Sequence, residues 1–180
     1  SSGDNCTCVK TPLIAWVSPL DAADTPNGAV GNFITIGGRY FGTTVGQVIF
    51  MGDPNNAGDD KVATFPNLVN PLCTSYWQDE QIIVVVPGGA VSGPIKVIDN
   101  KNYYDTTDNN RGARIKDFSI NNIKRPGLCD INPNSGGLAD RFNLQGSGFN
   151  ASPRSVFFGN GAGAIAANDI AGWTNTAVNA

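Results

Sequence analysis

One nine-residue stretch of this chain occurs twice, and the two copies lie 108 residues apart. Residues 34–42 read ITIGGRYFG and residues 142–150 read FNLQGSGFN, so both follow the pattern apolar-x-apolar-x-Gly-x-x-Phe. Self-similarity over such a distance predicts that the chain contains two copies of one structural module. The alignment continues with four further matches, which are Val48 with Val156, Phe50 with Phe158, Pro19 with Pro133 and Trp77 with Trp173.

Short apolar stretches separated by turn-forming residues recur through the first copy, at intervals of about 8 to 12 residues. The side chains of Ile34 and Ile36 fall on one face by the two-residue period of a strand. Residues 82–87 are apolar on both faces, so we expect this strand to lie centrally in its sheet. The spacing predicts an antiparallel β-sandwich. The expected strands are residues 13–17, 33–36, 47–51, 82–87, 94–98 and 113–120.

The composition supports an all-β fold. Gly (22), Pro (11) and Asn (21) make up 54 of the 180 residues, whereas Glu and Met occur once each. Turn formers are therefore abundant and helix formers scarce, which excludes a helical bundle. A hydrophobic content of 41% and a net charge of only −3 are typical of a folded chain rather than a disordered one.

The chain contains no histidine, which excludes several kinds of active site. Neither a Ser-His-Asp or Cys-His nucleophile nor a His-containing metal site can form. The only glutamate, Glu80, has no facing carboxylate for glycoside hydrolysis. We therefore predict that the chain is not an enzyme and has no catalytic residue, resident metal or cofactor.

Charge and hydropathy restrict the partners. Fifteen acidic residues against 12 basic ones argue against a nucleic-acid-binding surface. No apolar run approaches the ~20 residues that span a bilayer, so we predict no membrane insertion. The chain does not begin with Met and carries nothing like a signal peptide, so we expect a processed chain or a piece of a longer protein.

Four cysteines, Cys6, Cys8, Cys73 and Cys129, are widely and irregularly spaced. An even number in such a pattern indicates disulfides and an oxidising compartment, and the alternative is buried free thiols in a cytosolic protein. Cys6 or Cys8 can pair with Cys73 inside the first copy, which would leave one tail cysteine and Cys129. That remaining pair would either link one chain to the next or form within a chain whose tail folds back.

The first copy resembles the IPT/TIG family of immunoglobulin-like domains, the plexin and transcription-factor type. The resemblance rests on Pro19, on residues 34–42, on residues 46–52 (GQVIFMG), on residues 77–87 (WQDEQIIVVVP) and on residues 92–97 (SGPIKV). Their order and spacing match the family over nearly the whole first copy. Tandem domains of this kind occur in prokaryotic cell-surface repeat proteins.

The resemblance implies an all-β fold of two tandem immunoglobulin-like β-sandwiches, the second of which is incomplete. The predicted divisions are an N-terminal tail (residues 1–11), a first module (residues 12–124) and a second module (residues 125–180). After Trp173 the family continues with an apolar strand, a hairpin and a closing strand, whereas seven residues follow here. We expect the second module to lack its central apolar strand and to leave a hydrophobic groove open.

Three explanations of the incomplete second module remain open. The chain is a fragment of a longer tandem array, or its remaining residues were not sequenced, or another chain supplies the missing strands by strand addition.

Residues 99–110 form a polar stretch that we expect to be a loop. Asp99, Asp105 and Asp108 are weak candidates for a cation site, because calcium binds clustered carboxylate and amide oxygens. Lys101 stands where an oxygen ligand is needed, so a solvated, turn-rich loop is the alternative.

Tyr103 and Tyr104 lie in the same stretch and are candidates for ligand contact. An exposed aromatic side chain among Asn and Asp residues can stack on a sugar ring. The alternative is that one tyrosine belongs to the core and the other to its rim.

These observations predict a non-enzymatic extracellular module, structural or adhesive, of a cell-surface protein. It would act as a rigid spacer or assemble into filaments by strand addition between chains. The expected partners are other copies of the chain or further domains of the same parent protein. The alternative function is a carbohydrate-binding accessory module that binds a surface glycan.

Overall fold

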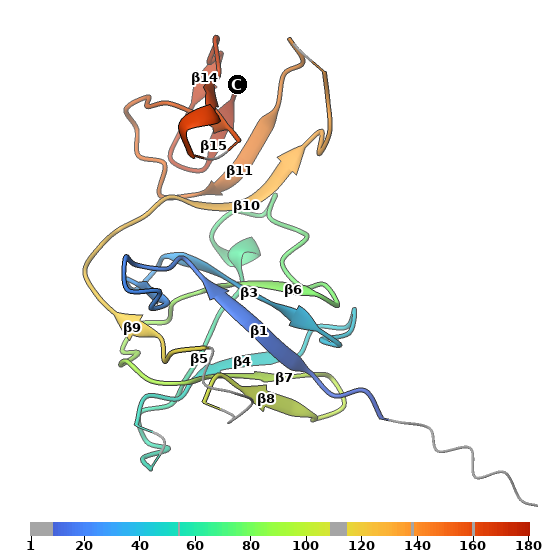
Figure 1. The fold of residues 1–180 in the computed structure, drawn as a ribbon, viewed down its shortest axis with the longest axis vertical. Coiled ribbons are helices and arrows are strands. Elements are labelled where there is room, and N and C mark those ends of the chain that lie inside the picture. The colour runs from blue at the N-terminus through green and yellow to red at the C-terminus, as the bar shows by residue number, and fades with distance from the viewer. Residues whose placement is uncertain (1–8, 54, 109–114, 138, 160) are drawn as a thin grey trace, which may run out of the picture.

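The computed structural model describes residues 9–53, 55–108, 115–137, 139–159 and 161–180. These residues form short strands and two short 3-10 turns, with no longer helix among them, so the predicted all-β class is confirmed. Within the described ranges no helix is long and apolar enough to cross a membrane. Figure 1 shows two lobes stacked along the longest axis, with β1 to β9 in one lobe and β10 to β15 in the other.

The first module consists of two antiparallel sheets that enclose a hydrophobic core (Figure 1). A parallel pair of short strands lies beside them. One sheet has the order β1 (Leu13–Ser18), β3 (Phe33–Arg39) and β6 (Gln81–Val85). The other has the order β5 (Lys61–Val62), β4 (Gln47–Phe50), β7 (Ile95–Ile98) and β8 (Tyr104–Thr106). The remaining elements are β2 (Asn27–Gly28), η1 (Pro66–Leu68) and β9 (Ser119–Ile120).

Alternating side chains from the two sheets build the core of the first module. Ile34 and Ile36 of β3 meet Val48 and Phe50 of β4 in one buried cluster, as the two-residue period predicts. Phe118 joins them through an edge-to-face contact with Phe50 at a ring-centroid distance of 5.3 Å. Burial of each such side chain stabilises the fold by about 1.5–3 kcal/mol.

The apolar strand β6 comes last in the strand order, so it does not lie between two full strands as predicted. On its side away from β3, only isolated bridges join Ile82 to Trp77 and Val85 to Thr64. Ile82 and Val84 face the core, while Ile83 and Val85 are buried on the opposite face. A second hydrophobic cluster, formed where the second module packs on the sheet, covers that opposite face. The two-sided apolar pattern therefore reflects packing on both faces of the sheet rather than a central place within it.

The polar stretch at residues 99–110 contains a strand that the sequence pattern did not reveal, so its assignment as a loop alone is wrong. β8 pairs with β7 and forms the edge of the four-stranded sheet. The carboxylate of Asp105 in β8 is buried and accepts a hydrogen bond of 2.8 Å from the backbone N–H of Ile14 in β1. This hydrogen bond ties the two sheets together at one end of the sandwich.

The second module contains a four-stranded sheet and a separate hairpin. Its sheet has the order β10 (Gly127–Asn132), β11 (Asn143–Ser147), β15 (Ala177–Asn179) and β14 (Gly172–Trp173). The hairpin pairs β12 (Phe157–Phe158) with β13 (Ile165–Ala166), around η2 (Gly161–Gly163).

The repeat recognised in the sequence recurs in the geometry of the strands. β10 pairs with β11 as β1 pairs with β3, and each pair has a register shift at the corresponding place. A Cβ at Gly38 would lie 2.0 Å from the carbonyl oxygen of Leu13, and a Cβ at Gly146 would lie 2.0 Å from that of Gly127. Only glycine permits this close approach of two backbones. The same packing constraint therefore explains both glycines of the repeated motif.

The second module has a strand at the position that we expected to be empty. Val178 of β15 pairs with Leu144 of β11, as Ile82 of β6 pairs with Ile36 of β3. The prediction that this strand is missing is therefore wrong. Its Ala-Val-Asn sequence lacks the continuous apolar run that marks β6, which is why the pattern did not reveal it.

The second sheet of the second module is less complete than its counterpart. Among the described residues of this module, β12 and β13 match β4 and β5, and no strand matches β7 or β8. Phe158 of β12 is 42% exposed, whereas the matching Phe50 of β4 is 1% exposed. The groove was expected at the position of the missing strand, which β15 occupies, and the exposed apolar surface lies instead at the β12–β13 hairpin.

Candidate functional site

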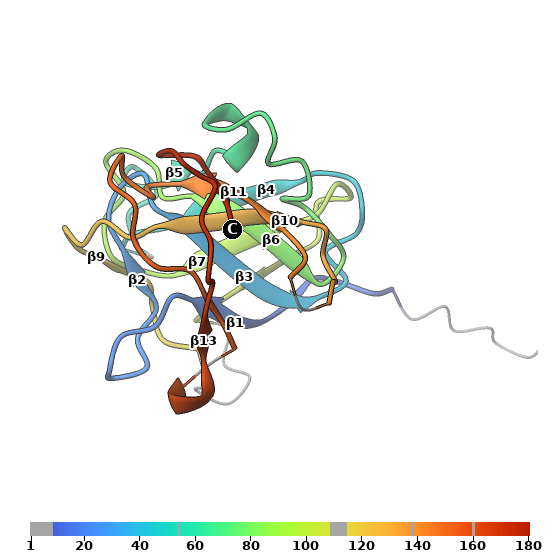
Figure 2. The same ribbon diagram turned by 90° about the horizontal axis from the view of Figure 1, so that it is seen from above.

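The joint between the two modules is the most elaborately connected part of the molecule outside the core. Strand β10 crosses the outer face of the β1–β3–β6 sheet, as Figure 2 shows from above. A hydrophobic cluster fills the contact. Because successive residues of a strand point to opposite faces, outward positions of β3 and β6 supply three of its first-module members, and Cys73 comes from the segment between η1 and β6. The buried members are Phe33, Cys73, Ile83, Val85 and Cys129.

A disulfide crosses the joint. Cys73 and Cys129 are bonded, with Cα atoms 5.5 Å apart and a sequence separation of 56. The expected pairing of Cys73 with Cys6 or Cys8 is therefore wrong, as is the expectation that Cys129 links to a tail cysteine. Cys6 and Cys8 lie outside the described residues. In the chain-entropy model a loop of this length stabilises the folded state by about 4 kcal/mol.

Asn70 forms a polar clamp beside the disulfide. Its side chain is only 5% exposed, and its amide donates to the Gly146 carbonyl at 3.2 Å and to the Thr176 carbonyl at 3.1 Å. The same amide lies 3.2 Å from Oε1 of Gln145. Its own oxygen accepts a hydrogen bond from the backbone N–H of Leu72. One buried amide of the first module therefore satisfies backbone acceptors of two segments of the second.

The connection between the modules is pinned to the first module rather than free. The amide of Asn32 donates to the carbonyl of Ile123 at 2.9 Å, and its oxygen accepts from the backbone N–H of Arg125. The guanidinium of Arg125 donates to the carbonyl of Asn27 at 3.2 Å, and Lys124 donates to the carbonyl of Val30. These contacts fix the direction in which the chain enters β10.

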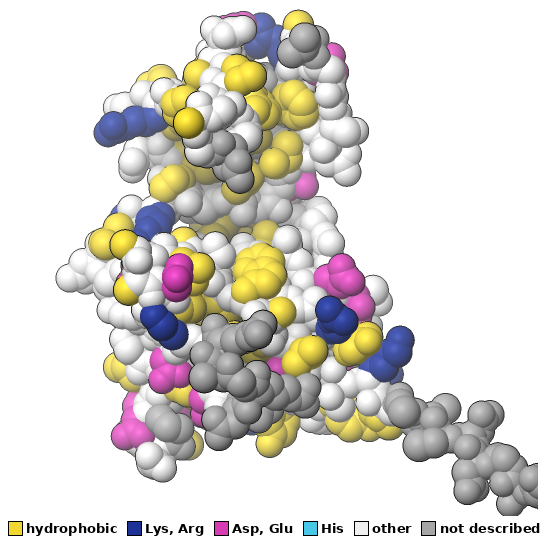
Figure 3. All heavy atoms as spheres, viewed as in Figure 1, with side chains coloured by type: hydrophobic (Ala, Val, Ile, Leu, Met, Phe, Trp, Pro, Cys, Tyr) yellow, Lys and Arg dark blue, Asp and Glu magenta, His cyan; other side chains and the backbone are white. Residues whose placement is uncertain are grey.

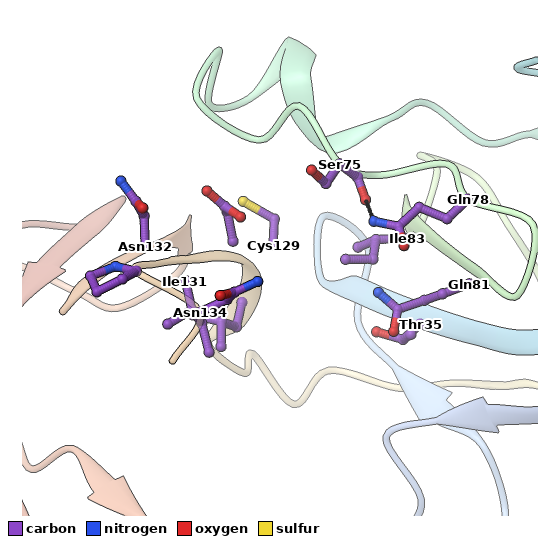
Figure 4. Close-up of a pocket in the computed structure, with 12 residues that line it drawn as sticks. Thr35, Ser75, Gln78, Gln81, Ile83, Cys129, Ile131, Asn132 and Asn134 are labelled. Carbon is purple, nitrogen blue, oxygen red and sulfur yellow. Dashed lines mark hydrogen bonds between the residues drawn. The ribbon is translucent and has the colours of Figure 1, made fainter. Parts of the chain in front are cut away.

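A cleft of about 790 Å³ opens on one side of the joint (Figure 4). Figure 4 shows side chains of the first module facing those of the second across the opening. Hydroxyl and amide groups dominate its walls, and Gln78 donates to the carbonyl of Ser75 at 3.4 Å. The polar lining residues are Thr35, Ser75, Gln78 and Gln81 from the first module and Asp130, Asn132 and Asn134 from the second.

The chemistry available in the cleft is hydrogen bonding. Among its lining residues Asp130 is the only charged group, and none is Lys or Arg. Amides both donate and accept, so such walls suit a neutral ligand that carries many hydroxyl groups. These residues carry no signal in the sequence, because the cleft exists only where β10 folds back over the first sheet.

The aspartates considered for a cation serve as backbone acceptors. Asp99 accepts from the backbone N–H groups of Lys101 at 2.8 Å and Tyr103 at 2.9 Å, and Asp105 accepts from Ile14. In the described part of the chain, no three His, Cys, Asp or Glu residues gather as a metal site would require. Asp108 is exposed, and its negative charge contributes to a raised pKa of Asp117.

Tyr103 and Tyr104 are both exposed, so neither belongs to the core. The ammonium group of Lys96 lies over the ring of Tyr104, 4.2 Å from its centroid, and occupies one of its faces. Figure 1 places β8, which begins at Tyr104, at the end of the first module that is remote from the joint. The structure therefore does not bring the predicted tyrosines together with the cleft.

Comparisons with known proteins give weak similarities only. No family model matches the chain, and no curated protein matches it. One similar solved structure is that of the surface glycan-binding protein PbSGBP-B from Prevotella bryantii. The match has 16% sequence identity and a TM-score of 0.39, and it covers 95% of this chain and 36% of that one. Another was determined with xylogluco-oligosaccharide, with 13% identity, a TM-score of 0.37, and coverage of 95% and 35%. This chain thus spans about a third of the length of either, and similarity at this level carries no information about its function.

Proposed function

We propose that this chain is a non-enzymatic, extracellular pair of modules that acts as a rigid structural or adhesive part of a cell-surface protein. The joint supports the proposal, because a disulfide, a buried amide clamp and a pinned connection hold the modules in one orientation. A structural disulfide suits a protein that matures outside the reducing cytosol. Membership of the IPT/TIG family, proposed from the residues of the first copy, agrees with this role.

Rigidity follows from what reorientation would break. Rotation of the second module would uncover the cluster around Phe33 and Ile83 and would remove the side-chain donor of Asn70 from the buried carbonyl of Gly146. An unpaired buried polar group costs about 1–3 kcal/mol. The disulfide limits any such rotation further, because it joins the modules at a second point in addition to the chain itself.

Small-angle X-ray scattering of the full chain tests this proposal. We expect one elongated, two-lobed particle with the profile of a rigid body. A variant that combines Cys73→Ser, Cys129→Ser and Asn70→Ala should show a broader distribution of shapes, while Asn100→Ala, an exposed residue remote from the joint, should match the wild type. A wild-type profile that requires an ensemble of inter-module angles would refute the rigid role.

Self-assembly by strand addition is a second candidate function. The exposed hairpin of the second module favours it, because Phe158 and Ile165 border an apolar cavity of about 770 Å³. In the described residues β12 pairs only with β13, which leaves its other edge open to a strand from a second copy. Sedimentation at rising concentration should then show growing species that Phe158→Ser abolishes, and a strictly monomeric chain would refute this candidate.

A further inference from the structure

Trp16 stands on the outer face of the β1–β3–β6 sheet, away from the core. A register shift between Ile14 and Trp16 turns Ile14 inward and places Trp16 opposite Gly37. A Cβ at Gly37 would lie 2.0 Å from Cε2 of the indole and slightly farther from two of the atoms bonded to it, Cζ2 at 2.2 Å and Nε1 at 2.4 Å. Cε2 lies between Cζ2 and Nε1 in the ring, and an approach within the ring plane would meet one of those two atoms first. The backbone of β3 therefore meets the face of the indole rather than its edge.

The opposite face of this indole is open. Trp16 is 47% exposed, which is a large apolar area to leave in water. Figure 3 shows an exposed hydrophobic patch on the first module, over β3 and close to the narrowing between the lobes. A ring held flat on glycine and open on its other side is a platform on which a second flat surface can stack.

The platform adjoins the polar cleft at the joint. Gly37, beneath the indole, pairs with Gln81 of β6, and Thr35 lies two residues along β3 on the same face. Directly opposed residues in a sheet have Cβ atoms about 4.5–5.5 Å apart. Gln81 and Thr35 both line the cleft, so the indole and the first hydrogen-bonding groups of the cleft are neighbours.

The fold itself does not require a tryptophan at this place. In the second module the same register shift occurs, and Asp130 stands opposite Gln145 where Trp16 stands opposite Gly37. Gly38 and Gly146 recur because two backbones meet there, but the Trp16–Gly37 pair is confined to the first module. Because the second copy of the repeat has no tryptophan at this position, we infer that Trp16 has a role other than folding.

We propose that Trp16 and the cleft at the joint form a binding site for a neutral oligosaccharide. The C–H face of a pyranose ring stacks on the open face of Trp16, and its hydroxyl groups bond with Gln81 and Thr35. Asn132 and Asp130 of the second module contact the next sugar unit from the opposite wall. A cleft of this size with a few convergent polar groups has the form of a small-ligand site. Trp16 does not itself line the cleft and adds an aromatic surface beside it, across Gly37 from Gln81.

The absence of Lys and Arg from the cleft lining selects against anionic ligands. A polyuronate would bring carboxylates close to Asp130 with no compensating cation among the lining residues. The site therefore discriminates neutral glycans from acidic ones by charge as well as by shape. This binding role goes beyond the structural role proposed above, and it uses residues of both modules.

Native affinity electrophoresis of the full chain tests the site, with β-glucan, xylan, xyloglucan, galactomannan, starch and polygalacturonate in separate gels. We expect retardation by at least one neutral polysaccharide and none by polygalacturonate. Calorimetry with oligosaccharides of the retarding polymer should show that Trp16→Ala raises the dissociation constant by about tenfold or more. Gln81→Ala should also weaken binding, whereas Tyr104→Ala, remote from the joint, should bind as the wild type does.

No retardation by any neutral polymer would overturn the proposal, as would unchanged binding by folded Trp16→Ala. If circular dichroism shows that Trp16→Ala has lost its fold, the binding of Gln81→Ala is measured instead, and unchanged binding by that folded variant would overturn the proposal. The X-ray scattering profile of Trp16→Ala should equal that of the wild type. The binding measurements therefore report on the site alone, and the scattering profile reports separately on the rigid joint.

Discussion

The side-chain amide of Asn70 in the first module donates a hydrogen bond of 3.1 Å to the backbone carbonyl of Thr176 in the second. The Asn70 side chain is buried, and it lies three residues before Cys73 of the disulfide that joins the same two modules. A hydrogen bond and a covalent bond therefore both cross the joint, and each can be removed by substitution without changing the main core of the first module.

Replacing Asn70 tests the clamp alone. Asn70→Ala removes the side-chain donor to the buried carbonyl of Gly146, whereas the carbonyl of Thr176 still accepts from the backbone N–H of Gly146, so we expect a loss of about 1–3 kcal/mol in the free energy of unfolding. Urea denaturation followed by fluorescence measures it. Asn100→Ala, an exposed substitution, should stay within about 0.5 kcal/mol of the wild type, and an equal value for Asn70→Ala would contradict the clamp.

Removing the disulfide tests the covalent part of the joint. The Cys73→Ala and Cys129→Ala double variant should lose about 4 kcal/mol of stability, because the unfolded chain is no longer constrained by the loop. Peptide mapping of the wild type without reductant should recover Cys73 linked to Cys129. Recovery of Cys73 linked to Cys6 or Cys8 would show that the joint is not cross-linked in this way.

The paired glycines of the repeat give a further test. In Gly38→Ala the new methyl group would lie 2.0 Å from the Leu13 carbonyl oxygen, a backbone atom that cannot move aside cheaply. We expect a loss of about 3 kcal/mol by thermal unfolding. Gly88→Ala is the matched control, since no atom lies within 4 Å of its added Cβ, and it should leave the stability nearly unchanged.

Asp117 predicts a pH dependence of stability. Partial burial raises the pKa of Asp117, and the negative charge of Asp108 raises it further. The folded state therefore holds this proton more tightly than the unfolded state, and the contribution of Asp117 to stability falls as pH rises from below 3.8 to above the raised pKa. Asp117→Asn should accordingly gain stability relative to the wild type at pH 7 and none at pH 3. Equal effects at both pH values would show that the pKa is not raised.

The parts of the fold that follow from local patterns were predictable. β3, β4 and β7 have alternating apolar residues, and the repeated glycines and phenylalanines indicated two modules. β8 escaped prediction, because Tyr104 is exposed and the buried residue of that strand is an aspartate whose partner in β1 is 91 residues away.

The candidate sites were beyond the reach of local patterns. Pairing of Cys73 with Cys129 depends on β10 folding back over the first sheet, which no spacing along the chain encodes. The same packing accounts for the outer apolar positions of β6 and creates the polar cleft. Trp16 stands on glycine because of a register shift in β1, and a one-residue shift of this kind leaves no clear mark in the sequence.

Residual dipolar couplings of the full chain in a weakly aligning medium measure the orientation of the two modules most directly. A rigid joint predicts that the couplings of both modules fit a single alignment tensor of one magnitude. Two tensors of different magnitude, with the smaller one for the second module, would show that the modules move independently and would contradict the rigid role.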